Sequence, residues 1–155
     1  MDFRPAIEAD IPALATLFHE TVMTHGPQHY SPAQTLAWAA AALDAAQFRH
    51  FILGVQTSIA ETTAGMVGFG GLSSDGRVAS LYVRHDCLGQ GVGAAILQFL
   101  IEQAEGDRLP RLYAEASEFS LGLFQKFGFR HYDTEVVERL GVSFTRYLVE
   151  RELAS

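Results

Sequence analysis

The chain has 155 residues, of which 48% are hydrophobic and 19% are charged, and its formal net charge is -7. These values indicate a globular protein and exclude a disordered one, and the length is that of a single domain covering 1–155. The acidic balance argues against a nucleic-acid partner, because phosphate backbones are held mainly by Lys and Arg. With no signal-peptide pattern and no apolar run of membrane-spanning length, we expect a cytoplasmic protein without a membrane partner.

The N-terminal part of the chain predicts one strand and two helices. The strand covers 1–7, and Asp10 is the expected N-cap of the helix that follows. The apolar residues of this helix recur at helical spacing: Ile11, Leu14, Leu17, Phe18 and Val22. After a loop, Ser31 and Pro32 form a typical cap and first position, which predicts a second helix over 32–46.

The middle of the chain predicts three strands and a third helix. The strands cover 50–56, 64–73 and 77–83. Asp75-Gly76, between the last two strands, is a strong signal for a hairpin. The helix covers 92–105, and its buried face is expected to consist of Val92, Ile96, Leu97, Leu100 and Ile101.

The C-terminal part of the chain predicts a strand, a short helix and two closing strands. They cover 111–117, 120–128, 129–137 and 143–150. The complete order, βααβββαβαββ, is that of a mixed sheet of the α/β (α+β) class. The apolar closing strands permit a homodimer.

Three glycines stand at alternating positions where a strand passes into a helix. They are Gly89, Gly91 and Gly93. Glycine lets a ligand approach the backbone closely, and the backbone N–H groups at a helix N-terminus bind anions. We therefore expect a phosphate or pyrophosphate to bind here. A dinucleotide is disfavoured, because its fingerprint follows the first strand of a parallel βαβ unit rather than an antiparallel hairpin.

Two segments of the chain resemble the GNAT superfamily of acyl-CoA-dependent N-acetyltransferases. The sequence LYVRHDCLGQGVGAAIL is similar to the acyl-CoA motif of that family, and AEASEFSLGLFQKFGF is similar to its second signature. HYSPAQTLAWA and VSFTRYLV further resemble a subgroup of small bacterial acetyltransferases. The resemblance covers essentially the whole chain. It implies a mostly antiparallel sheet of about seven strands, flanked by about four helices and splayed between the fourth and fifth strands.

The resemblance also implies that acetyl-CoA is the co-substrate. The N–H at or next to Val83 would donate to the thioester carbonyl. The 88–94 loop would hold the pyrophosphate, and Ser117 stands where the family often has an Asn. The implied cofactor-binding residues are Leu81, Tyr82, Val83, Leu88, Gly89, Gln90, Gly91, Val92, Gly93, Ala94, Ser117, Ser120 and Phe124. No metal is expected, because the single cysteine, Cys87, and the scattered histidines show no metal-ligand spacing.

Three positions depart from the family pattern. Leu88 stands where Gln or Arg is usual, and Arg77 stands where some members carry a catalytic Glu. Phe124 occupies the position of the Tyr that protonates the departing CoA thiolate in many members. A thiol with a pKa of about 8.5 is a tolerable leaving group even without such an acid. Tyr82, Tyr30 or a water could also supply the proton.

An amine acceptor must lose a proton before it attacks the thioester, and this step calls for a base. Glu115, on the strand beside the expected thioester cleft, is the first candidate, and His29 is the second. His29, Tyr30 and Trp38 are expected to line the acceptor pocket. Trp38 lies off the apolar stripe of its helix, which fits either a pocket wall or a second packing surface.

Together these features predict an N-acetyltransferase that moves an acetyl group from acetyl-CoA directly to a primary amine of a small-molecule or peptide acceptor. The catalytic candidates are Glu115, Val83, Tyr82 and His29. Two other interpretations remain open. One is a non-catalytic acyl-CoA-binding sensor, favoured by Phe124 and Arg77, and the other is a nucleotide-binding regulatory module.

Overall fold

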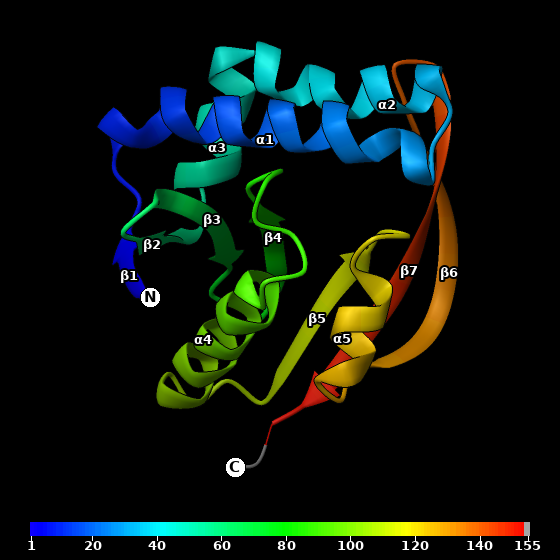
Figure 1. The fold of residues 1–155 in the computed structure, drawn as a ribbon. Helices are drawn as coiled ribbons and strands as arrows, with labels where there is room; N and C mark the ends of the chain where they lie inside the picture. The colour runs from blue at the N-terminus through cyan, green and yellow to red at the C-terminus, as the bar shows by residue number, and fades with distance from the viewer. Residues whose placement is uncertain (154–155) are drawn as a thin grey trace.

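The computed structural model describes residues 1–153, which form two β-sheets covered by helices (Figure 1). The strands are β1 (Asp2–Pro5), β2 (Gln56–Thr62), β3 (Gly65–Leu72), β4 (Val78–Val83), β5 (Arg111–Ala116), β6 (Arg130–Arg139) and β7 (Val142–Glu152). The α-helices are α1 (Ile11–His25), α2 (Pro32–Ala39), α3 (Ala45–Leu53), α4 (Val92–Gly106) and α5 (Leu121–Lys126). Short 3-10 turns lie at Glu8–Asp10, Gly26–Gln28 and Ala40–Leu43. Among the helices of this described range, none is long and apolar enough to cross a membrane.

The strands form two antiparallel sheets that are joined at one point. Their orders are β1-β2-β3-β4 and β5-β7-β6. A parallel bridge between Arg77 and Tyr113 joins them, and the Tyr113 N–H donates to the Gly76 carbonyl at 3.0 Å. Within residues 1–153, β4 and β5 share no other bridge, and Figure 1 shows them apart at their carboxyl-terminal ends. This arrangement confirms the α+β sheet of about seven strands, splayed between the fourth and fifth.

The helices bury two apolar clusters against the sheets. Helices α1 and α3 cover one cluster, in which Phe18, Phe48 and Phe69 are buried. Helix α4 covers the other, and every residue predicted for its buried face is buried. The helix lies close to β3 because glycines face it there: a Cβ added to Gly70 would lie only 2.6 Å from Ile96 Cγ2. Burial of these faces places the N-terminus of α4 beside the end of β4 (Figure 1).

The prediction between residues 32 and 56 was wrong in two places. Helix α2 ends at Ala39 instead of continuing to 46, and the segment 50–56, predicted as a strand, mostly belongs to α3. The Asp44 carboxylate accepts a hydrogen bond from Gln47 N at 3.0 Å and so starts this separate helix. Phe48 and Ile52, four residues apart, then bury one helical face. The strand itself, β2, begins only at Gln56.

Three local predictions at turns had different outcomes. Ser31 caps α2 as expected: its Oγ accepts from Gln34 N at 3.1 Å, and the Gln34 side chain accepts from Ser31 N at 2.9 Å. Asp10 does not cap α1 with its side chain. Its carboxylate instead accepts hydrogen bonds from Arg4 and from Ile7 N, which fix the turn before the helix. The Asp75-Gly76 hairpin is confirmed, with Gly76 at φ +97°.

Candidate active site

A cavity of about 620 Å³ opens where β4 and β5 diverge. It is lined by strands β4 and β5, by the segment after β5, and by the loop before α4 with the first turn of that helix. Helices α1 and α2 and the β6–β7 hairpin also contribute to the lining. The predicted residues that line it are Tyr30, Trp38, Leu81, Tyr82, Val83, Leu88, Gly89, Gly91, Val92, Gly93, Ala94, Glu115, Ser117, Ser120 and Phe124. Gln90 and His29 are not among the described lining residues. The expected cofactor and acceptor residues therefore share one cavity.

The loop before α4 presents open backbone to this cavity. Gly89 and Gly91 have φ values of +77° and +81°, and a Cβ added to either would meet nothing within 4 Å. The Ala95 N–H donates to the Gly91 carbonyl at 3.1 Å, which leaves the preceding N–H groups of the first turn without a helical partner. Gly93 instead allows close packing against α5, since an added Cβ would lie 3.3 Å from Leu123 Cδ2. The free N–H groups and the helix dipole suit an anion.

The end of β4 directs the Val83 N–H toward β5. The Arg84 N–H donates to the Val67 carbonyl on β3 at 2.8 Å, and successive N–H groups of a strand point to opposite edges. Thr21 Oγ1 donates to the Val83 carbonyl at 2.9 Å, which ties the strand end to α1. The Val83 N–H is thus held at the opening, where it can donate to an acyl oxygen.

Tyr82 stands on the α1 side of β4 as a neutral phenol. Trp38 Nε1 donates to the Tyr82 hydroxyl at 3.1 Å, and the Tyr82 ring packs against Phe18 with centroids 4.7 Å apart. Burial raises the pKa of Tyr82 to about 12. Because the hydroxyl accepts from Trp38, its own proton is left to donate to a group in the cavity.

Four aromatic residues form a contiguous surface that we call the aromatic wall: Tyr30, Trp38, Phe119 and Phe144. The Tyr30 ring lies 5.5 Å from Trp38 and 5.6 Å from Phe144, and the Trp38 ring lies 5.8 Å from Phe119. Trp38 also packs against the apolar cluster under α1, so it belongs both to a second packing surface and to the cavity lining. Its contact with an acceptor stays a prediction. The wall brings together α2, the loops after α1 and β5, and strand β7.

Glu115 projects from β5 into the same cavity, where it is paired with arginine. Both of its carboxylate oxygens accept from Arg77 Nε at 3.1 Å. Arg146 Nη1 lies 3.9 Å from Glu115 Oε1, while Arg146 Nε donates to Glu135 at 2.9 Å. Arg77 occupies the position where some family members carry Glu, whereas the carboxylate that lines this cavity comes from β5. Each oxygen of a carboxylate accepts more than one hydrogen bond, which leaves Glu115 able to accept from an acceptor molecule or water.

The turn between β5 and α5 is held by two serines. Ser117 Oγ accepts from Phe119 N at 3.2 Å, and Ser120 Oγ accepts from Ser117 N at 2.9 Å. Both serines line the cavity. Phe124 also lines it but is only 3% exposed and packs edge-on against Phe129, with centroids 4.9 Å apart. Its side chain supplies no proton to a leaving group, so any such proton comes from elsewhere.

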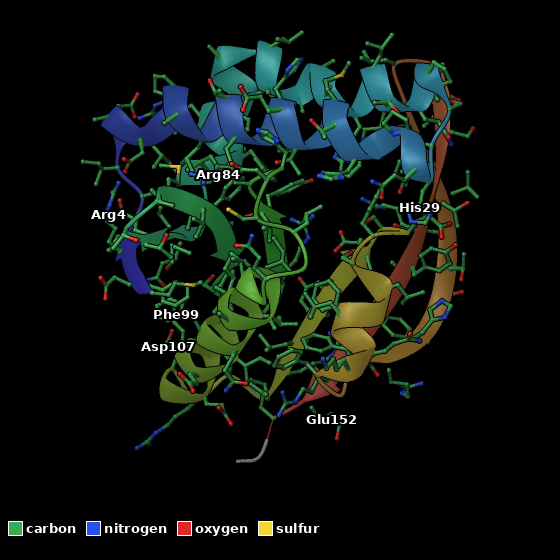
Figure 2. All side chains as sticks on the ribbon, viewed as in Figure 1. Arg4, His29, Arg84, Phe99, Asp107 and Glu152 are labelled. Carbon is green, nitrogen blue, oxygen red and sulfur yellow. The ribbon has the colours of Figure 1, made fainter. Side chains whose placement is uncertain are left out.

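His29, the second candidate base, is exposed after α1 (Figure 2). Its ring packs edge-on against Phe119, on the loop before α5, with centroids 4.6 Å apart. His29 therefore touches the aromatic wall from outside the described lining of the cavity.

The cavity residues that the sequence reasoning missed include Phe119, Arg139, Phe144 and Arg146. Three of them lie on the β6–β7 hairpin, whose register pairs Glu135 with Arg146 and Val137 with Phe144. Period-two alternation could have placed these side chains on one face of the hairpin. It could not have shown that this face meets α2.

The comparisons with known proteins agree with this fold. Residues 27–151 match the family model described as an acetyltransferase (GNAT) domain, and the chain belongs to this family of acyltransferases. It is similar to the uncharacterized N-acetyltransferase YafP of Escherichia coli (strain K12), with 29% identity over 139 residues that cover 89% of this chain and 87% of YafP.

Two solved structures are similar over almost their whole length. The first is the GCN5-related N-acetyltransferase "Aminotransferase, Class-II" from Rhodopseudomonas palustris, with a TM-score of 0.93, 28% identity, and coverage of 98% of this chain and 95% of that one. The second is the PaiA N-acetyltransferase from Thermoplasma acidophilum in complex with coenzyme A, with a TM-score of 0.80, 13% identity and 98% coverage of both chains. At 13% identity, the similarity to the second structure shows a shared fold alone.

Proposed function

We propose that the protein transfers an acetyl group from acetyl-CoA directly to a primary amine of a small-molecule or peptide acceptor. Family membership supports acetyl transfer in general. The observation that carries the finer proposal is one cavity with two chemically different ends. At one end lie the N-terminus of α4 and the Val83 N–H, and at the other lie Glu115 and the aromatic wall.

The residues at the first end fit a CoA thioester. The open backbone at Gly89 and Gly91 and the free N–H groups of α4 suit the pyrophosphate. Leu88, which replaces the usual Gln or Arg, lines the cavity and is 44% exposed. Acetyl-CoA, when bound, supplies an acetyl group activated as a thioester. The Val83 N–H would donate to the acyl oxygen and stabilise the negative charge that develops on it.

The chain's own side chains also support direct transfer to the acceptor. Glu115 would take the proton from the amine, and the neutral Tyr82 phenol would donate a hydrogen bond toward the leaving sulfur. Cys87 lines the cavity but is buried, and burial raises the pKa of its thiol. A buried protonated thiol is a poor nucleophile, which disfavours an acetyl-cysteine intermediate.

The proposed function is tested by following free CoA thiol while a panel of amines is added to the protein and acetyl-CoA. We expect thiol release that depends on the added amine. Tight binding of acetyl-CoA without amine-dependent release would contradict transfer and support an acyl-CoA sensor. Preferential binding of ATP or NAD over CoA would instead support a nucleotide-binding module.

The pyrophosphate site gives a direct prediction at Ala94, a half-buried cavity residue in the first turn of α4. Ala94→Glu places a negative charge beside the expected phosphates at a helix position that favours Glu, so the fold should be kept. At an effective dielectric constant near 40, repulsion over about 6 Å costs about 1.4 kcal/mol. We expect calorimetry to show about tenfold weaker binding of acetyl-CoA.

The matched control for this prediction is Ala94→Gln, which adds the same bulk without the charge. Its affinity for acetyl-CoA should stay closer to that of the unmodified protein. Equal affinities for the Glu and Gln variants would place the phosphates away from the first turn of α4.

A further inference from the structure

The acceptor end of the cavity carries an excess of positive charge. Its lining contains Arg77, Arg139 and Arg146 against a single carboxylate, Glu115. This contrasts with the whole chain, whose formal net charge is -7. Arg77 is paired with Glu115, and Arg146 with Glu135. Arg139, in contrast, makes no ion pair or side-chain hydrogen bond to any residue in 1–153.

Arg139 belongs to the acceptor end because of its place in the β6–β7 hairpin. It pairs in register with Val142, two positions along the strands from the pair formed by Val137 and Phe144. Residues two apart in a strand share a face, so Arg139 lies on the face that carries Phe144 of the aromatic wall. The loop before α4, where we expect the pyrophosphate, follows β4 and so belongs to the other sheet.

The charge of Arg139 also reaches the Tyr82 phenol. Burial raises the pKa of Tyr82, and both the hydrogen bond from Trp38 and the positive charge of Arg139 act in the opposite direction. The effect of Arg139 is the smallest of these, and both residues line the cavity although they come from different sheets.

We propose that the acceptor is a small amine that also carries a carboxylate, with Arg139 binding the carboxylate and the aromatic wall binding an apolar body. This proposal rests on the proposed function. A guanidinium donates to a carboxylate through two parallel N–H groups, and Arg139 has its donors free within the described chain. A peptide N-terminus lacks such a nearby carboxylate, because its first carboxyl group is part of an amide.

The test compares amino acids with their decarboxylated amines as acceptors, for the unmodified protein and for Arg139→Gln. We expect the unmodified protein to prefer the amino acids with apolar side chains. Arg139→Gln should raise the KM of these amino acids at least about tenfold and leave the KM of the decarboxylated amines nearly unchanged, since the lost interaction is made only with the carboxylate. Arg139→Lys should recover part of the affinity.

The matched control is Arg108→Gln, which removes the same charge from an exposed arginine outside the cavity. Among the described residues Arg108 likewise has no ion pair. Its kinetics should equal those of the unmodified protein. A higher KM for acetyl-CoA in Arg139→Gln would overturn the proposal by assigning Arg139 to a CoA phosphate. A preference for decarboxylated amines in the unmodified protein would also overturn it.

Calorimetric binding of the preferred amino acid, in the presence of CoA rather than acetyl-CoA, separates this proposal from the proposed function. Here no acetyl group is available for transfer. Weaker binding of the amino acid to Arg139→Gln supports carboxylate recognition, whether or not any amine is acetylated. If no amine is acetylated, the proposed acetyl transfer is contradicted and carboxylate recognition still stands. Binding that does not change in Arg139→Gln overturns carboxylate recognition, whatever the enzyme acetylates.

Discussion

Glu115→Gln is expected to lower kcat/KM for the amine about 10²- to 10⁴-fold, which is the usual contribution of a general base. The loss should grow as the pH falls below the amine pKa of about 8, because without a base the enzyme depends on amine that is already neutral. The affinity for acetyl-CoA should stay unchanged, since Glu115 lies at the acceptor end. A pH–rate profile of both proteins measures the effect.

Glu150→Gln is the matched control for this experiment. Glu150, on β7, also pairs with two arginines, Arg111 at 2.9 Å and Arg130 at 2.5 Å, but it lies outside the cavity. The Glu150→Gln substitution should leave the pH–rate profile of the enzyme unaltered. If Glu115→Gln shows the same unaltered profile, Glu115 only positions Arg77 and Arg146, and the base is His29 or an ordered water.

Gly76→Ala is expected to reduce the free energy of unfolding by about 2–5 kcal/mol. Gly76 has a φ of +97°, and an added Cβ would lie 2.2 Å from the Arg111 backbone carbonyl oxygen. A left-handed Ala costs about 1–2 kcal/mol, and the clash with a backbone atom adds a packing cost of about 1–3 kcal/mol. Because Gly76 accepts from Tyr113 N, this clash falls on the junction of the two sheets.

Gly141→Ala separates the two costs of that substitution. Gly141 also has a positive φ, +76°, but a Cβ there would meet nothing within 4 Å. Chemical denaturation should show a loss of only about 1–2 kcal/mol for this variant. Equal losses for the two variants would show that the close approach of Gly76 to β5 is not a source of stability.

The parts of the fold that the sequence predicted are those set by local patterns. The apolar spacing of 92–105 and the glycines before it placed α4 and its exposed N-terminus, and Asp75-Gly76 placed a hairpin. The capping residues Ser31 and Gln34 likewise act within a few residues of each other. Short-range rules decide such features, so one sequence is enough to predict them.

The features that the sequence did not predict depend on contacts between distant segments. Apolar residues in 50–56 suit a strand or a buried helix, and only packing against α1 decides for the helix. The pairing of Glu115 with Arg77 needs the register of two strands from different sheets. Arg139 enters the cavity only because the β6–β7 hairpin reaches α2, where Gln34 donates to the Ser143 carbonyl at 3.0 Å.

Transfer of an isotopically labelled acetyl group tests the central claim most directly. Acetyl-CoA labelled in the acetyl group is incubated with an accepted amine and the unmodified protein, Ala94→Gln or Ala94→Glu, and the products are identified by NMR. At acetyl-CoA concentrations below saturation, we expect labelled N-acetyl amide from the first two and about tenfold slower formation from Ala94→Glu. Label that stays on CoA with the unmodified protein, or equally fast transfer by Ala94→Glu, would contradict acetyl transfer from this cavity.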